Sequence, residues 1–99
     1  MYIYKFINEH GELIYVGIAK CKNRRISQHI KADLRKIKEA RYIYYSYDFD
    51  KFYIKRLEKY MICKYKPKYN KIGGKNAVIT REIEDKEWIL FGGTNNEWN

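Results

Sequence analysis

The chain opens with two short runs of β-branched and aromatic residues on either side of a polar turn. The runs are Tyr2–Ile7 and Leu13–Val16, and the turn is Asn8–Gly11. Gly11 supplies the positive φ that a tight connection usually requires. The pattern therefore predicts a β-hairpin at the start of the chain.

After Gly17 the apolar residues recur every three or four positions, which is the period of an amphipathic helix. The pattern predicts a helix over residues 22–38 with a basic outer face, and a break near Asp33 that would divide it in two. Its apolar stripe consists of Ile26, Ile30, Leu34 and Ile37.

A second aromatic and β-branched run, Tyr42–Phe49, predicts a third strand. The carboxylate of Asp48 or Asp50 can then cap another helix. Pro67 should end that helix, because its ring cannot continue the hydrogen-bond ladder. The apolar stripe expected on this helix is Ile54, Leu57, Met61 and Tyr65.

Beyond Asn70 the residues Ile72–Gly74 form a break, and Ala77–Ile83 with Trp88–Phe91 predict a second hairpin before a polar tail. The expected fold class is α+β, with a small three-stranded antiparallel sheet flanked by helices in the order β-β-α-β-α, plus this C-terminal hairpin. We expect residues 1–71 to form the core, and residues 72–99 to pack on the same domain and cap a sheet edge.

Charge narrows the classes of function. The 99 residues suffice for about one domain, and they carry 21 Lys and Arg against 12 Asp and Glu, for a net charge of +9. Residues 1–70 hold 17 basic and 7 acidic side chains, whereas residues 71–99 hold 4 and 5. A positive field of this kind attracts polyanions, of which nucleic acid is the commonest.

Several other classes are not supported by the sequence. No apolar run approaches the ~20 residues of a membrane span, and the N-terminus lacks the basic-then-apolar order of a signal peptide. Cys21 and Cys63 have neither a CxxC partner nor a histidine cluster nearby, so they do not indicate a zinc site. We expect two reduced thiols in a cytoplasmic protein without a membrane partner, with Cys63 filling core space.

Two triplets suggest a family. Tyr2-Ile3-Tyr4, ten intervening residues and Tyr15-Val16-Gly17 together resemble the paired signature of the GIY-YIG nuclease superfamily. Four further positions follow in the family's order and spacing, namely Arg25, His29, Glu58 and Asn70. The chain departs from the pattern at Tyr2, where glycine is usual, and at Ile18, where some members carry a lysine that Lys20 could replace.

The resemblance implies a metal-dependent nuclease that cuts phosphodiester bonds, with Mg²⁺ or Mn²⁺ held chiefly by Glu58. Arg25 suits bidentate binding of a phosphate, and His29 could donate to a phosphate oxygen or pass a proton. By resemblance, Tyr4 or Tyr15 is the general base or orients the attacking water, and Tyr4 is preferred. The predicted catalytic set is thus Tyr4, Tyr15, Arg25, His29 and Glu58.

Two further residues are expected to support the site. Gly17 should let the backbone turn closely at the strand end, and the Asn70 amide should pin the segment after the last helix. The nearby cations should contact phosphates without reading base sequence; they are Lys20, Lys22, Arg24, Lys31 and Arg35.

Two functions remain open at this level. The first is an endonuclease acting on DNA, with RNA left open, whose sequence specificity should be slight unless the chain forms a homodimer or recruits a protein partner. The second is a basic nucleic-acid-binding module of the same fold without catalysis, which predicts salt-sensitive binding and no cleavage. Glu58 favours the nuclease, because a carboxylate near phosphates is a liability for binding alone.

Overall fold

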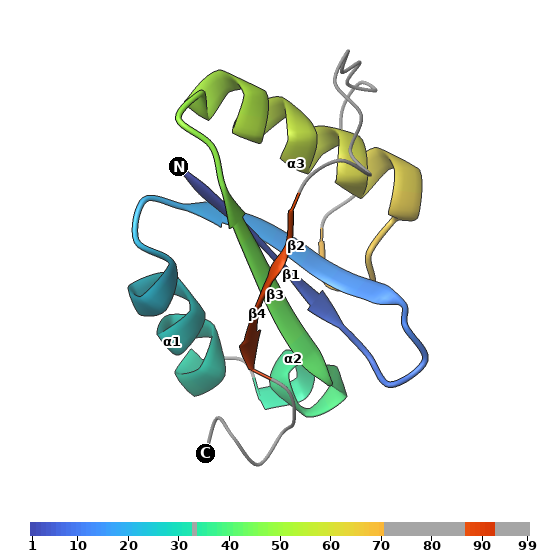
Figure 1. Cartoon of the computed structure of the whole chain (residues 1–99). Helices are drawn as coiled ribbons and strands as arrows, with labels where there is room; N and C mark the ends of the chain where they lie inside the picture. The colour runs from blue at the N-terminus through green and yellow to red at the C-terminus, as the bar shows by residue number, and fades with distance from the viewer. Residues whose placement is uncertain (33, 71–86, 93–99) are drawn as a thin grey trace.

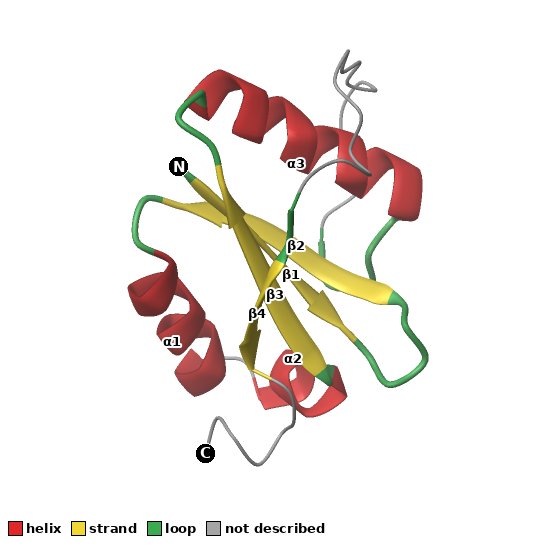
Figure 2. Ribbon diagram, viewed as in Figure 1, coloured by secondary structure: helices red, strands yellow, loops and turns green. Residues whose placement is uncertain are grey.

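A computed structural model of the chain describes residues 1–32, 34–70 and 87–92. Its core is an antiparallel sheet with the strand order β2-β1-β3-β4. Figure 1 shows α3 on one side of this sheet and α1 and α2 on the other, and Figure 2 marks the same elements by type. The elements in chain order are β1 (Tyr2–Ile7), β2 (Leu13–Ala19), α1 (Lys22–Ala32), α2 (Leu34–Glu39), β3 (Tyr42–Tyr47), α3 (Lys51–Tyr65) and β4 (Ile89–Gly92).

The predicted N-terminal hairpin is present as β1 and β2. Its turn is fixed by Asn8, whose Oδ1 accepts hydrogen bonds from the backbone N–H groups of His10 and Glu12, both at 2.9 Å. Gly11 has a φ of 79°, a conformation that residues with a Cβ rarely adopt. The hairpin therefore owes its connection to one amide side chain and one glycine.

The two faces of β1 belong to different hydrophobic clusters. Ile3 packs with the buried side of α3, where Ile54 and Leu57 are fully buried. Tyr4 and Phe6 point to the opposite face and pack with residues of α1, α2 and β3. This division follows from the two-residue period of a strand, and it places the signature tyrosine Tyr4 beneath α1.

The helices follow the sequence prediction closely. The apolar stripe over residues 22–38 is divided between α1 and α2, as expected near Asp33. Asp50 caps α3, because its Oδ1 accepts hydrogen bonds from the N–H groups of Phe52 and Tyr53. The helix ends at Tyr65, and Lys66 adopts a left-handed φ of 48° immediately before Pro67.

The sheet has four strands rather than the three predicted, because the predicted hairpin arm Trp88–Phe91 is present as β4 and joins the sheet. β4 pairs antiparallel with β3 through contacts that include Tyr44 with Leu90. Without β4, the backbone N–H and C=O groups on the outer side of β3 would be unpaired. β4 pairs with part of that side. The predicted hairpin arm Ala77–Ile83 lies outside the described residues.

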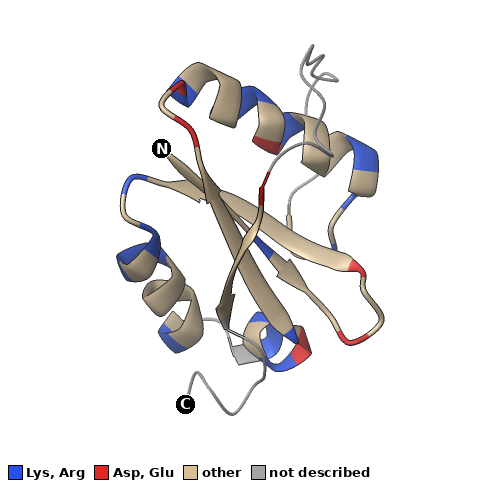
Figure 3. Ribbon diagram, in the orientation of Figure 1, with Lys and Arg blue, Asp and Glu red and all other residues tan. Residues whose placement is uncertain are grey.

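Most basic side chains of the described regions lie on the helices and adjoining loops, whereas the strands carry few charges (Figure 3). Within these regions, no helix combines the length and the apolar character that crossing a membrane would need. Cys21 is exposed and Cys63 is half-buried, and neither forms a disulfide.

Candidate active site

Tyr4 lies at the centre of the sheet and is fully buried. Across the hairpin it pairs with Gly17. A Cβ on Gly17 would lie 2.5 Å from both Cζ and the hydroxyl oxygen of Tyr4, closer than packed atoms can approach. Gly17 was predicted to allow a turn, but it lies inside β2 and among glycines of the described residues only Gly11 has a positive φ. Its missing side chain instead makes room for the Tyr4 ring.

The Tyr4 hydroxyl meets two residues of α1. It lies 2.8 Å from Nε2 of His29, and the guanidinium of Arg25, one turn earlier on the same helix, lies near it. Burial raises the pKa of the Tyr4 phenol well above its ordinary value, as does the neighbouring Tyr15, whereas Arg25 acts in the opposite direction. The phenol is therefore protonated at neutral pH in the protein alone.

Tyr15 completes an aromatic group around the histidine. Its ring centroid lies 5.0 Å from that of His29 and 6.1 Å from that of Tyr4. Tyr15 is half-buried, so it is the more accessible of the two phenols. The structure thus brings together four of the predicted residues, Tyr4, Tyr15, Arg25 and His29, from two strands and one helix.

A fifth member of this group, Lys36 on α2, was not among the predicted site residues. Its side chain is only 6% exposed. Its Nζ lies 3.1 Å from Nδ1 of His29 and 3.7 Å from the centroid of the Tyr15 ring. We call Tyr4, Tyr15, Arg25, His29 and Lys36 the tyrosine cluster.

Lys36 also changes the role expected of His29. Both ring nitrogens of the imidazole are engaged inside the protein, Nε2 by Tyr4 and Nδ1 by Lys36. The expectation that His29 donates directly to a phosphate oxygen is therefore at odds with this arrangement. The imidazole contacts Tyr4 through Nε2.

Arg25 stands at the border between the tyrosine cluster and solvent. Its Nη1 donates to Oε1 of Gln28 at 3.3 Å. It also lines a shallow pocket of about 290 Å³ with Ala19, Lys20 and Arg24, where β2 leads into α1. An exposed guanidinium that also contacts a buried phenol can join a bound anion to Tyr4.

The predicted phosphate-contacting cations surround this border. Lys20, Arg24, Lys31 and Arg35 are exposed. Lys22 is half-buried, and its Nζ lies 4.6 Å from the ring centroid of Tyr45. No acidic side chain lies in the first turn of α1. The resulting surface is positively charged beside Arg25.

Glu58 comes from α3, which packs on the other face of the sheet from the tyrosine cluster. Within the described residues its carboxylate has no hydrogen bond or ion pair with any other group, so none joins it to the cluster. It is half-buried, and burial raises its pKa, with Lys59 partly opposing the effect. A half-buried carboxylate without a partner is costly unless a cation offsets it.

These features fit one kind of metal site. Within the described residues no three His, Cys, Asp or Glu side chains are grouped to hold an ion. Mg²⁺ takes one or two carboxylates and keeps several waters, so it does not need an all-protein cage. The carboxylate oxygens of Glu58 are hard ligands, and such an ion would bind to them.

Asn70 links the end of the domain to the signature strand. Its Oδ1 accepts from the Val16 N–H and its Nδ2 donates to the Val16 carbonyl, both at 2.9 Å. The neighbouring Tyr69 N–H donates to the carbonyl of Ile14. These bonds pair backbone groups of Ile14 and Val16 on the outer edge of β2. They hold in place the strand that carries Tyr15 and Gly17.

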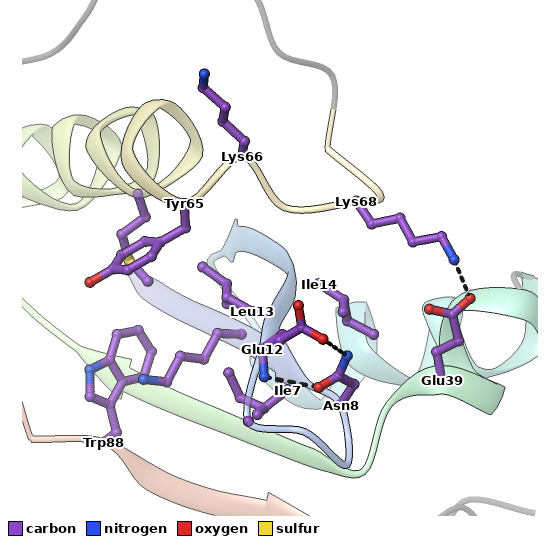
Figure 4. A pocket seen from close by; sticks show the side chains of 13 residues that line it. Ile7, Asn8, Glu12, Leu13, Ile14, Glu39, Tyr65, Lys66, Lys68 and Trp88 are labelled. Carbon is purple, nitrogen blue, oxygen red and sulfur yellow. Dashed lines mark hydrogen bonds and ion pairs between the residues drawn. The ribbon is translucent and has the colours of Figure 1, made fainter.

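A larger pocket of about 660 Å³ lies elsewhere, between the β1–β2 turn, the end of α3 and Trp88. Figure 4 shows Trp88 and Tyr65 on one side of it and the Lys68–Glu39 ion pair on the other. None of its lining residues belongs to the tyrosine cluster. The larger pocket is therefore separate from the tyrosine cluster.

Comparison with known proteins agrees with the geometry. The family model described as the GIY-YIG catalytic domain matches residues 1–70. The chain belongs to the GIY-YIG family. This confirms the resemblance inferred from the two tyrosine triplets, and the GIY-YIG match includes every member of the tyrosine cluster together with Glu58 and Asn70.

Two relatives of this GIY-YIG chain are the UvrABC system protein C from two strains of Bacteroides fragilis. Each is 35% identical over 77 residues, which cover 69% of this chain and 12% of the relative. The GIY-YIG chain thus corresponds to about an eighth of the length of these relatives. No solved structure matches it.

Proposed function

We propose that this GIY-YIG protein is a divalent-metal-dependent endonuclease that hydrolyses phosphodiester bonds in DNA with little intrinsic sequence specificity. The observation that carries the proposal is the buried Tyr4 hydroxyl, which both Arg25 and His29 contact. A phenol held this way inside a basic surface has no evident purpose in a fold that only binds phosphates.

Hydrolysis adds water across one P–O bond. The water oxygen attacks phosphorus, the bond to the leaving sugar oxygen breaks, and the water proton ends on that leaving oxygen. Charge builds up on the phosphoryl oxygens as the attack proceeds, so preorganised positive charge speeds the reaction. Arg25 supplies that charge, because its guanidinium never loses its proton at neutral pH.

We assign the two phenols to the attacking water molecule. We assign Tyr4 to orient the attacking water or accept its proton; the Arg25 guanidinium favours the deprotonated phenol, although burial raises the pKa of Tyr4 overall. Tyr15 lies next to it and is more accessible. We assign His29 to support Tyr4 through Nε2.

Glu58 would hold Mg²⁺ or Mn²⁺ through its carboxylate. The ion, when bound, would polarise the phosphate and stabilise the leaving oxygen. Glu58 and the tyrosine cluster lie on opposite faces of the sheet, so a substrate that meets both would have to reach around the sheet. The exposed cations beside Arg25 would contact neighbouring phosphates and would not read bases.

The test compares cleavage of branched, single-stranded and duplex DNA with Mg²⁺, with Mn²⁺ and with a chelator. Wild type should cleave at least one substrate in the presence of metal, and Glu58→Ala should not. Glu9→Gln, which changes an exposed carboxylate, is the matched control and should cleave like wild type. Cleavage that survives Glu58→Ala would remove this carboxylate from the mechanism.

The same experiment tests the alternative function. A non-catalytic binding module would retain salt-sensitive DNA binding and cleave nothing under any metal condition. That outcome would overturn the nuclease proposal and would leave phosphate binding as the function of the basic surface.

A further inference from the structure

Lys36 is an unusual residue to bury. Its side chain is 6% exposed, and an ammonium group is expensive to remove from water unless nearby groups replace the lost hydration. It comes from α2 and lies against His29 of α1 and the ring of Tyr15 from β2. The structure therefore places a buried cation directly behind the residues that contact Tyr4.

The contact with His29 fixes which ring nitrogen carries a proton. An ammonium has three donors and no acceptor. At 3.1 Å from Nδ1 of His29, a charged Lys36 can only donate, which assigns Nδ1 as the unprotonated, accepting nitrogen. The neutral imidazole then carries its proton on Nε2.

The same reasoning extends one step further, to Tyr4. Nε2 lies 2.8 Å from the Tyr4 hydroxyl oxygen, so in this tautomer the Nε2–H donates and the Tyr4 oxygen accepts. The guanidinium of Arg25 also lies near that oxygen. Both contacts favour negative charge on the phenol oxygen, and neither consumes the proton that the phenol itself carries.

We propose that Lys36 is a positioning residue of the nuclease, which holds His29 in the Nε2–H tautomer so that the imidazole stabilises charge on the Tyr4 oxygen. The proposal rests on the proposed function for its effect on rate. Its structural part, the tautomer, stands without it. The ammonium also opposes a second proton on His29, because that proton would have to occupy the nitrogen that faces Lys36.

The test uses Lys36→Met, which keeps the length of the side chain but removes its charge and its donors. Long-range ¹H–¹⁵N correlation spectra report the His29 tautomer. Wild type should show the proton on Nε2, and Lys36→Met should show a mixture of the two tautomers. Lys38→Met, which changes an exposed lysine of the same helix, should keep the wild-type spectrum.

Rates provide the second readout. In single-turnover cleavage at saturating DNA, Lys36→Met should be about 10- to 100-fold slower, the scale of a lost preorganised donor. The DNA concentration for half-saturation should change less than about threefold, because Lys36 is buried away from the substrate. Lys36→Arg keeps a donor-only cation and should restore the tautomer and part of the rate.

The outcomes separate the two proposals. A wild-type His29 with its proton on Nδ1, or a tautomer that Lys36→Met leaves unchanged, would overturn the role of Lys36 whether or not the protein cuts DNA. Absence of cleavage by wild type would overturn the nuclease function, and the spectra would still decide the tautomer. If Lys36→Met does not fold, the wild-type spectrum and Lys36→Arg answer the same question.

Discussion

Gly17 and Tyr4 face each other across the β1–β2 pair so closely that a Cβ on Gly17 would lie 2.5 Å from the Tyr4 hydroxyl oxygen. The glycine in the second triplet and the tyrosine in the first are therefore two halves of one packing arrangement. One supplies the hydroxyl, and the other supplies the space in which it lies.

Gly17→Ala should displace the Tyr4 ring and separate its hydroxyl from His29. We expect a loss of about 1–3 kcal/mol in the free energy of unfolding, the usual cost of overpacking. We also expect a drop in cleavage of about 100-fold, because the Tyr4 hydroxyl loses its place. Denaturant unfolding and single-turnover cleavage measure the two effects.

Gly11→Ala is the control for this substitution. At Gly11 a Cβ would meet nothing within 4 Å, but the φ of 79° is unfavourable for alanine. The variant should lose about 1 kcal/mol and cut DNA at the wild-type rate. Equal cleavage by Gly17→Ala and Gly11→Ala would show that the Tyr4 ring does not need its position.

Arg25→Ala should reduce cleavage strongly while the fold is retained. The guanidinium is exposed and lies outside both hydrophobic clusters, so circular dichroism and thermal unfolding should change little. The rate at saturating DNA should fall about 100- to 1,000-fold, as when a charge-stabilising donor is removed. Arg41→Ala, at an exposed arginine beyond α2, should cleave normally, and a similar loss there would point to general charge rather than to Arg25.

Tyr4→Phe keeps the buried ring and removes the hydroxyl. Cleavage should be lost to a similar extent as in Arg25→Ala. Stability should also respond to pH in a defined direction. Burial raises the pKa of Tyr4, so its contribution is fully present below the unfolded value of about 10 and is lost as pH rises above it.

Unfolding of wild type and Tyr4→Phe, followed from neutral to alkaline pH, checks this sign. The difference in stability between them should be constant at neutral pH and should move in favour of Tyr4→Phe above about pH 10. A difference that does not vary with pH would show that the Tyr4 phenol ionises as readily in the fold as in the unfolded chain.

Glu58→Gln should raise the stability of the fold at neutral pH while it abolishes cleavage. Burial raises the pKa of Glu58, so the folded state favours the protonated form. Its contribution to stability is fully present below the unfolded pKa of about 4.3 and is lost as pH rises through the folded value. At neutral pH the glutamine variant should therefore melt up to about 4 °C higher than wild type, and the gap should close in acid.

Mg²⁺ adds a second comparison for the same variant. If the carboxylate binds the ion, Mg²⁺ should raise the melting temperature of wild type. Above the dissociation constant, the rise should grow with the logarithm of the Mg²⁺ concentration. Glu58→Gln should show no such rise and no cleavage. An equal rise in both proteins would place the ion elsewhere.

Asn70→Ala should weaken the outer edge of β2. Removal of both bonds to Val16 leaves a backbone N–H and a carbonyl with no side-chain partner, and we expect a cost of about 1–3 kcal/mol. Amide hydrogen exchange at Val16 should become faster by the corresponding factor. Asn23→Ala, at an exposed asparagine of α1, should cost less than about 0.5 kcal/mol, and unchanged exchange at Val16 in Asn70→Ala would contradict the assigned contact.

Local patterns in the sequence were sufficient to predict most of the fold. The hairpin turn, the division near Asp33 and the Asp50 cap depend on neighbouring residues, and all three are present. The fourth strand depends on a pairing between β3 and residues about 45 positions later in the sequence, which local patterns do not specify. That is why the sheet was predicted with three strands.

The site was predictable where the residues follow the spacing of the family signature. The spacing of Tyr4, Tyr15, Arg25 and His29 pointed to residues that the structure does bring together. Lys36 looked like one more lysine of a basic helix. One signal was available: it follows His29 by seven residues, two helical turns, and precedes the buried Ile37. The break between α1 and α2 hides that signal, because it interrupts the helical period.

The bond between Asn70 and Val16 spans 54 residues of sequence. During synthesis, β1 and β2 leave the ribosome long before Asn70 does, so the signature strand spends that interval with its outer edge unsecured. These hydrogen bonds to β2 form only once Asn70, the last residue of the family match, is present. A nascent chain shortened by a few residues would carry every candidate catalytic side chain and still lack the bond that locks them.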